Sequence, residues 1–140
     1  MQKKIRYIYF LIFFTILLTT CIGYVQHLNM SQKMENQMAE KAFKTAIEMK
    51  YPVVLVFYAS WCQDSLGFIP IVRAQENKFG EKVLFIKVNV DDEANNAFAG
   101  KYNFKYLPHT VVYDRMGVVF VEFTGIKTHN QMEEIIIKLL

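Results

Sequence analysis

The sequence predicts an α/β fold in which a mixed β-sheet is flanked by helices and preceded by a membrane or signal segment. Runs of β-branched and aromatic residues alternate with segments of helical spacing, and two later runs form a hairpin pattern. An uncharged apolar run comes before all of these elements. With 140 residues, the chain has room for one folded domain after that run.

The N-terminal segment has the features of a membrane signal. Lys3, Lys4 and Arg6 precede the run Tyr7–Val25, which is almost wholly apolar. A helix of that length spans about 28 Å, close to the hydrocarbon thickness of a bilayer. The basic residues should stay in the cytoplasm, so we expect the remainder of the chain on the extracytoplasmic side.

Three forms of this signal remain open. An uncleaved signal anchor fits because no small-residue A-x-A site follows the apolar run. A lipoprotein signal would place the lipid on Cys21, although Thr20 stands where a smaller residue is usual. Cleavage and release is the third form. The first two forms leave the domain on the cell membrane, as a single-pass or a lipid-anchored protein.

The remainder divides into a stalk and a domain. We expect residues 1–28 to be the signal segment, residues 29–41 a linker or stalk, and residues 42–140 the folded domain. Apolar residues recur at helical spacing over Ser31–Lys50, and Pro52 should end that helix.

The first half of the domain predicts a strand, a helix and a second strand. The run Val53–Ala59 is continuously apolar, as in a central strand buried on both faces. Helical spacing follows from about Cys62 to Phe79, and Val83–Val90 predicts the next strand. Two strands joined by a helix should be parallel.

The second half predicts a short helix, a hairpin and a final helix. The capping residues of the two helices are polar side chains that can accept hydrogen bonds from backbone N–H groups. In order, the elements are a short helix after Asp91-Asp92 that ends near Tyr102, strands Thr110–Asp114 and Val118–Thr124, and a helix from Thr128 with Gln131 at capping-box spacing.

Charge and composition exclude several classes of function. The chain has 16 basic and 13 acidic residues, and three of the basic residues precede the apolar run, which leaves 13 of each in the body. A nucleic-acid binder needs a basic face, so we expect no nucleic-acid partner. Two cysteines are too few for a cysteine-rich zinc site, and no glycine-rich phosphate loop is present. We therefore expect no metal and no cofactor.

Cys62 is the residue best placed for chemistry. It lies between a buried strand and the first turn of a helix, where unpaired N–H groups favour an anion. The thiolate is the reactive form of cysteine. The flanking Ser60, Gln63, Asp64 and Ser65 indicate an exposed loop rather than a buried, inert cysteine.

From about residue 42 to residue 140, the chain resembles the thioredoxin family. The motifs that carry the resemblance are Val53–Ala59 leading into Trp61-Cys62, Pro70, the strand Phe85–Asp91, Leu107-Pro108 at the place of the family's cis-proline, Gly117 and Gly125. No segment matches the family's opening strand. The resemblance therefore implies a thioredoxin-like fold with a four-stranded sheet.

The resemblance also implies thiol–disulfide exchange and assigns roles to the matched residues. Cys62 matches the attacking thiol, and Pro108 matches the cis-proline beside it. Trp61 matches the aromatic residue that flanks the site. Backbone groups beside the cis-proline would pair with an extended substrate, so we expect Trp61, Leu107 and His109 to contact the substrate.

Two departures from the family pattern affect the chemistry. Ser65 stands where the family has its second cysteine, so no neighbouring thiol can resolve a mixed disulfide. Its hydroxyl can donate a hydrogen bond to the thiolate, and we count it with Cys62 and Pro108 as catalytic. The buried acid of many relatives falls at Val56, which leaves Lys87 without its usual partner.

His109 is a third departure, because relatives often carry threonine after the cis-proline. Two interpretations remain open. The imidazole can pair with the Cys62 thiolate or donate a proton to it, or the side chain is an exposed polar residue at the rim of the site.

Three functions follow from these residues. The first is a membrane-tethered, extracytoplasmic exchange protein, an oxidoreductase or isomerase, in which Cys62 forms a mixed disulfide with a protein substrate and an external thiol reductant releases it. The second is a binding or retention module that holds a partner at the membrane. The third is a non-catalytic subunit of a membrane complex. The sequence leaves open whether the protein is an enzyme.

Overall fold

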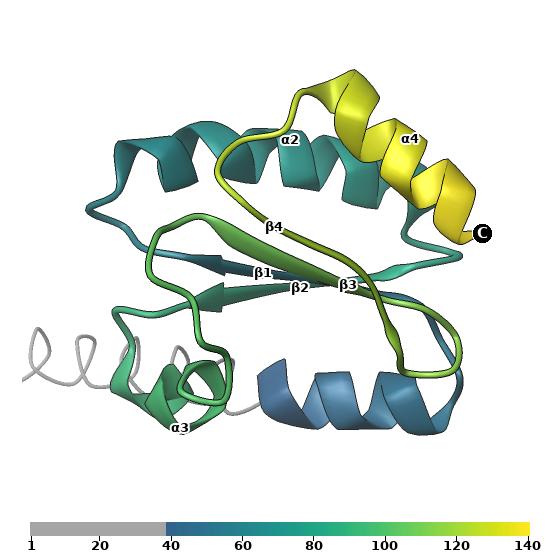
Figure 1. Ribbon diagram of the computed structural model, residues 1–140, viewed down its shortest axis with the longest axis horizontal. Coiled ribbons are helices and arrows are strands. Elements are labelled where there is room, and N and C mark those ends of the chain that lie inside the picture. Colours follow the sequence, from purple (N-terminus) through teal and green to yellow (C-terminus); the bar gives the residue numbers. More distant parts are fainter. Residues whose placement is uncertain (1–38) are drawn as a thin grey trace, which may run out of the picture. The chain divides into compact units, whose positions relative to one another are not determined.

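The structure, a computed structural model, describes residues 39–140, and a mixed sheet lies at the centre of this part of the chain (Figure 1). The strand order is β2-β1-β3-β4, which confirms the predicted four-stranded sheet. β1 runs parallel to β2 and antiparallel to β3, and β4 is antiparallel to β3. The strands are β1 (Val53–Tyr58), β2 (Leu84–Asn89), β3 (His109–Tyr113) and β4 (Val119–Thr124).

Helices cover both faces of the sheet (Figure 1). One face carries α2 (Gln63–Phe79) and α4 (His129–Leu139). The other face carries the helix over residues 39–48 and a short helical segment after β2, made of η1 (Glu93–Asn95) and α3 (Asn96–Ala99). The α/β class and the order of elements are therefore as predicted.

The predicted signal segment and most of the predicted stalk lie outside the described residues. Across residues 39–140, none of the helices has the length and apolar character needed to cross a membrane.

The alternation of side chains along β1 builds a separate core on each face of the sheet. Val53, Leu55 and Phe57 point to the side of the 39–48 helix, whereas Val54 and Val56 point toward α2 and α4. All five side chains are fully buried. Burial on both faces explains why this stretch of sequence is apolar without interruption.

Local signals fix the ends of several elements. Thr128 and Gln131 form the predicted capping box at the start of α4, with the Thr128 hydroxyl accepting from the Gln131 N–H. Asp92 caps η1 by accepting from the N–H of Ala94. In the turn between β3 and β4, Gly117 has a positive φ of 74°, which other residues rarely adopt.

Candidate active site

Cys62 lies at the N-cap of α2, just past the carboxyl end of β1. Its φ and ψ of −90° and 113° are extended, and its carbonyl accepts from the Leu66 N–H at 3.0 Å to close the first helical turn. The thiol is free and half-buried. Because the N–H groups of a first turn lack partners within the helix, this position favours negative charge.

The segment around Pro108 lies directly against the thiol. The Leu107-Pro108 peptide bond is cis, as the family resemblance implied. The Cys62 thiol donates to the Leu107 carbonyl, with 3.6 Å between Sγ and oxygen. Pro108 is buried, and its carbonyl accepts from the Gly125 N–H at 2.8 Å. The structure thus brings together Cys62, Leu107 and Pro108, three of the predicted site residues.

Exposed apolar side chains stand on the segments that meet at Cys62. Trp61 and Tyr106 are 73% and 74% exposed. Ile126 follows Gly125, and its Cδ1 lies 3.8 Å from the position a Cβ would take at Gly67 on α2. Apolar side chains exposed in this number around one residue suit an apolar partner. The set is Trp61, Leu66, Tyr106 and Ile126.

Asp91, which the sequence predicts to cap a helix, instead holds the turn before Cys62. The sequence predicts that Asp91 shares in capping the helix, but Asp92 does so alone. The Asp91 carboxylate instead accepts from the Ser60 N–H at 2.6 Å. Asn89 donates to the Ser60 hydroxyl at 3.3 Å. These contacts link the carboxyl ends of two adjacent parallel strands. Polar residues that directly follow such strands are the feature of the sequence from which contacts of this kind could be predicted.

Ser65 is fully buried, and its hydroxyl contacts the backbone at the end of β1. The hydroxyl oxygen accepts from the Ala59 N–H at 3.4 Å, the bond that the structure gives this side chain. Ser65 therefore fastens α2 to the end of β1. Because this contact uses the oxygen as an acceptor, donation of the hydroxyl proton to the Cys62 thiolate stays a prediction.

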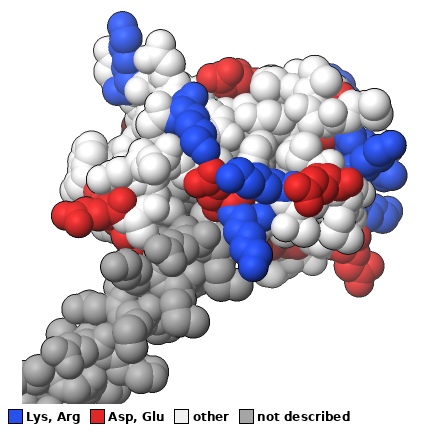
Figure 2. Space-filling model, turned by 90° about the horizontal axis from the view of Figure 1, so that it is seen from below, with Lys and Arg blue, Asp and Glu red and all other residues white. Residues whose placement is uncertain are grey.

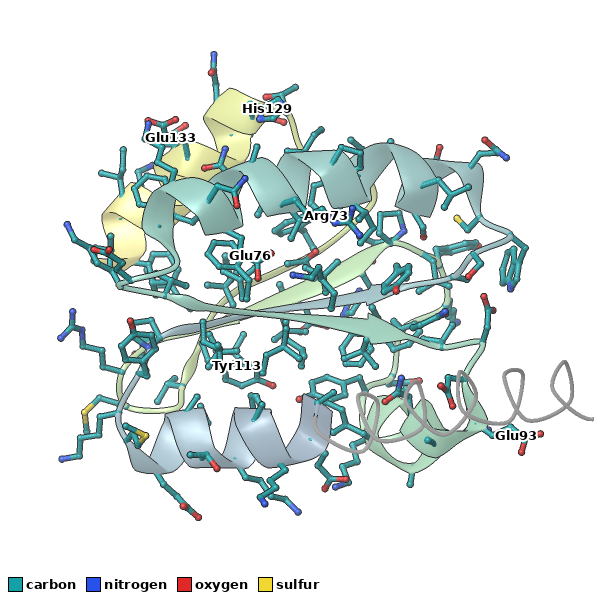
Figure 3. The ribbon with its side chains drawn as sticks, turned by 180° about the vertical axis from the view of Figure 1, so that it is seen from behind. Arg73, Glu76, Glu93, Tyr113, His129 and Glu133 are labelled. Atoms are coloured by element: carbon teal, nitrogen blue, oxygen red, sulfur yellow. The ribbon has the colours of Figure 1, made fainter. Side chains whose placement is uncertain are left out.

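Lys87 pairs with an acid on α2 rather than one on β1. Val56 is fully buried and pairs in register with Lys87 on β2, the proximity that the family resemblance implied. The Lys87 ammonium forms an ion pair with Glu76 at 2.5 Å, and Figure 3 shows Glu76 on the side of α2 that faces the sheet. Glu76 is 14 residues beyond Cys62 along α2. At about 1.5 Å per residue, the two are about 21 Å apart along the helix, so Glu76 cannot take the Cys62 proton.

His109 is buried, with an exposed fraction of 4%, so its interpretation as an exposed rim residue is wrong. Its Nδ1 lies 2.9 Å from the Thr124 hydroxyl. Its Nε2 lies 2.9 Å from a Glu122 carboxylate oxygen, an ion-pair distance at which the alignment falls short of a hydrogen bond. Both ring nitrogens are thus engaged by β4. The expected pairing with the Cys62 thiolate is not what the structure records.

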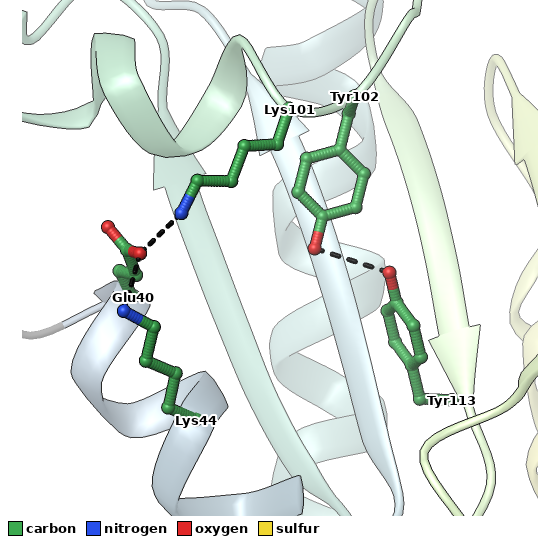
Figure 4. A network of polar contacts seen from close by, with 5 residues as sticks. All are labelled: Glu40, Lys44, Lys101, Tyr102 and Tyr113. Atoms are coloured by element: carbon green, nitrogen blue, oxygen red, sulfur yellow. Dashed lines mark hydrogen bonds and ion pairs between the residues drawn. The ribbon is translucent and has the colours of Figure 1, made fainter.

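A polar network ties the helix over residues 39–48 to the segment after α3 and to β3 (Figure 4). Hydrogen bonds from Lys101 and then Lys44 hold the pKa of Glu40 down at about 2. The Tyr113 hydroxyl donates to the Tyr102 hydroxyl at 3.2 Å. Burial and this contact raise the pKa of Tyr102. Figure 2 views the molecule from this side, and basic and acidic side chains lie next to one another there.

Metal-ligating residues do not gather in the described part of the chain. Among residues 39–140, no three His, Cys, Asp or Glu side chains are grouped closely enough to hold a metal ion.

Comparison with known proteins gives the family. The family model described as Thioredoxin matches residues 34–138. Mouse mitochondrial thioredoxin is 32% identical over 94 residues, which are 67% of this chain and 55% of the mouse protein. The thiol:disulfide interchange protein TxlA homolog of Synechocystis is 27% identical over 96 residues, 69% of this chain and 53% of that protein. The chain thus spans about half the length of these relatives.

A solved structure agrees in fold. The germline-specific thioredoxin Deadhead of Drosophila melanogaster superposes with a TM-score of 0.60 at 22% identity, covering 72% of this chain and 94% of that one. At this level of identity the similarity concerns the fold alone.

Proposed function

The chain belongs to the thioredoxin family, and from this membership we propose that it is a thiol–disulfide exchange protein that acts through Cys62 alone. The observation that carries the proposal is the place of Cys62 at the start of α2, with its thiol against the carbonyl that precedes the cis-proline. Accessibility, a helix N-terminus and an adjacent peptide edge are what an attacking thiol requires.

The proposed reaction has two steps. The Cys62 thiolate attacks one sulfur of a substrate disulfide, a new disulfide joins Cys62 to the substrate, and the second substrate sulfur leaves as a thiolate. Another thiolate then attacks the substrate sulfur of this mixed disulfide and releases Cys62. If it belongs to the substrate, the result is isomerisation. If it belongs to an external small or protein thiol, the substrate is left joined to that thiol.

Proteins with an accessible disulfide are the proposed substrates. An extended segment can lie along the Leu107-Pro108 edge, where backbone groups are close to the thiol. The exposed Trp61 and Tyr106 rings, which adjoin Cys62 and Leu107 in the chain, offer apolar contacts to such a segment. Ser65 and Pro108 support the site rather than react in this proposal.

We also propose that the protein is held at the cell membrane with the domain on the extracytoplasmic side. The support is the apolar run Tyr7–Val25 after three basic residues. Intact mass of the detergent-extracted protein separates the forms: an unmodified full-length mass indicates an uncleaved anchor, and loss of residues 1–20 with added lipid indicates modification of Cys21. A mass that lacks the whole apolar run and carries no lipid would contradict tethering.

A second candidate function is retention of a partner through a long-lived mixed disulfide. The observation that favours it is Ser65 at the position of the resolving cysteine. Without a neighbouring thiol, the covalent complex waits for an external one. In this case the protein would hold its partner and would not turn over.

Acid-quenched trapping in cells tests the proposal. Native protein and Cys62→Ser are compared on nonreducing gels, with Cys21→Ser as a matched control for the other cysteine. We expect reducible adducts from the native protein and the control, and none from Cys62→Ser, because Cys62 is the proposed attacking thiol. Mass analysis of the adducts identifies the substrates.

The persistence of the adducts separates the two functions. Adducts that turn over within minutes in cells, without added thiol, indicate exchange, and adducts that persist over the same period indicate retention. If native protein and Cys62→Ser both run only as monomers after oxidant stress, covalent chemistry at Cys62 is excluded and the non-catalytic subunit of a membrane complex becomes the better description.

A further inference from the structure

His109 is held on three sides although it takes no part in the proposed chemistry. Thr124 and Glu122 engage its two ring nitrogens from β4, each at 2.9 Å. Phe104 stacks on the ring, with 5.1 Å between centroids and 22° between planes. We call these four residues, His109, Glu122, Thr124 and Phe104, the His109 cluster. An imidazole held by so many partners has a fixed orientation.

The partners also determine which nitrogen of the neutral ring carries the proton. An ionised carboxylate can only accept, so the close approach of Glu122 favours a proton on Nε2. Nδ1 of the neutral ring then accepts from the Thr124 hydroxyl.

His109 is joined to the thiol through two residues of backbone. It is the first residue of β3 and pairs in register with Phe57 on β1 and Thr124 on β4. The carbonyl of Pro108, one residue earlier, accepts from the N–H of Gly125 at 2.8 Å. A displacement of the His109 ring would be transmitted through Pro108 to the carbonyl that precedes it.

We propose that His109 is a positioning residue that fixes the Leu107-Pro108 edge for an extended substrate, with Glu122, Thr124 and Phe104 holding its ring in place. The inference rests on the proposed function, because it concerns how a peptide disulfide is presented to Cys62. His109 touches neither the thiol nor the substrate in this role.

The proposal separates two reactions of the same thiol. A small disulfide needs only access to the half-buried Cys62. A peptide disulfide must also lie along the edge that His109 positions. A purely structural role would lower both rates together, through the fraction of folded protein.

The test compares these two substrates with the full-length protein in detergent. The small substrate is an aromatic disulfide that releases a coloured thiolate, and the other is a short extended peptide whose cysteine carries the same coloured thiol in a disulfide. We expect His109→Ala to lower the rate constant for the peptide about tenfold and that for the small disulfide by no more than about twofold, as loss of a positioned hydrogen-bond group implies.

Variants on β4 act through His109 and should have graded effects. Thr124→Val removes the Nδ1 partner and should slow the peptide reaction about threefold, and Thr124→Ser should restore it. Glu122→Gln should have a smaller effect in the same direction. The matched control is Glu134→Gln, which changes another exposed carboxylate, on α4, that pairs with Lys138 at 2.7 Å. This variant should change neither rate.

The outcomes distinguish the inference from the function on which it rests. Peptide rates of folded His109→Ala within about twofold of native, or a parallel fall of both rates, would overturn the role of His109 alone. If His109→Ala does not fold, the ratio of the two rates in Thr124→Val and Glu122→Gln decides in the same way. A native protein that reacts with neither disulfide overturns the proposed function and this inference together.

Discussion

The two faces of the sheet are packed by different side chains. On the α2–α4 face, the core is mainly aliphatic, with buried side chains such as Val72, Met132 and Ile136 from long helices. On the other face, rings contact rings: Phe57 alone lies 4.6 Å from Tyr102, 5.0 Å from Phe104 and 6.2 Å from Phe98, measured between centroids. Figure 3 shows Tyr113 on this second face.

Each face supports one half of the candidate site. The aliphatic face anchors α2, and α2 carries Cys62 at its first turn. The aromatic face holds the segment that leads to the cis-proline, because Phe104 packs on Phe57 and on His109. The comparison teaches that the reactive atom and the peptide edge depend on separate parts of one small core. They should therefore respond to different mutations.

Removal of one buried ring from each face should have the largest effect on the protein. Phe98→Ala and Phe68→Ala remove side chains that are 3% and 0% exposed. Each should lower the free energy of unfolding by about 3–5 kcal/mol, because a buried cavity replaces the ring. Urea unfolding measures this loss.

The reactions of the folded fraction then tell the faces apart. Phe98→Ala should slow the peptide disulfide more than the small disulfide, because Phe98 supports the aromatic face. Phe68→Ala should slow both, because it supports α2 under Cys62. The reverse assignment would contradict the division of the site between the faces.

Ser65→Cys changes a residue of the α2 face alone. A cysteine at this buried position restores a resolving thiol three residues after Cys62. The mixed disulfide should then decay about tenfold faster or more, since the attacking thiol belongs to the same molecule. Adduct lifetime after acid quenching at set times measures this, and Ser65→Ala is the matched control. An unchanged lifetime would mean that the introduced thiol cannot reach Cys62.

Glu40→Gln has the smallest expected effect and concerns the aromatic face alone. The bonds from Lys101 and Lys44 lower the pKa of the folded carboxyl from 4.5 to about 2. Stabilisation from a lowered pKa is present above about pH 4.5 and is lost as pH falls toward about 2. The variant should therefore unfold at a lower urea concentration than native protein at pH 7, and this difference should shrink below pH 4.5.

A second carboxylate provides the comparison for this test. Lys138 lowers the pKa of Glu134 within α4, on the other face of the sheet. Because that pair joins neighbouring turns of one helix, Glu134→Gln should alter the urea midpoint less than Glu40→Gln, which breaks a tie between segments. A larger effect of Glu134→Gln would argue against the importance of the Glu40 network.

The elements of the fold could be predicted because their signals are local. The apolar run of β1 and the Thr128–Gln131 capping box are each contained in a few consecutive residues, and both are as predicted. Cys62 could be placed at a helix start for the same reason. The cis form of Leu107-Pro108 was implied only by the family resemblance, since the local sequence permits either isomer.

The partners of the site residues could not be predicted, because they come from segments far apart in the chain. Asp91 reaches back 31 positions to Ser60, and Glu122 meets His109 only because β3 and β4 pair in one particular register. A polar residue in a sequence carries no sign of which remote strand it will face. For His109, the pairing of β3 with β4 explains why the side chain is buried rather than exposed at the rim.

Val56 affects how Cys62 loses its proton in the first step of the proposed reaction. Its methyl groups fill a place where many relatives keep an acid, so β1 offers no internal acceptor for the proton that leaves Cys62. The half-buried sulfur can instead exchange its proton with water. The Cys62 thiol therefore has no buried acid on β1 with which to exchange its proton. In the proposed reaction, solvent takes the place of the buried acid.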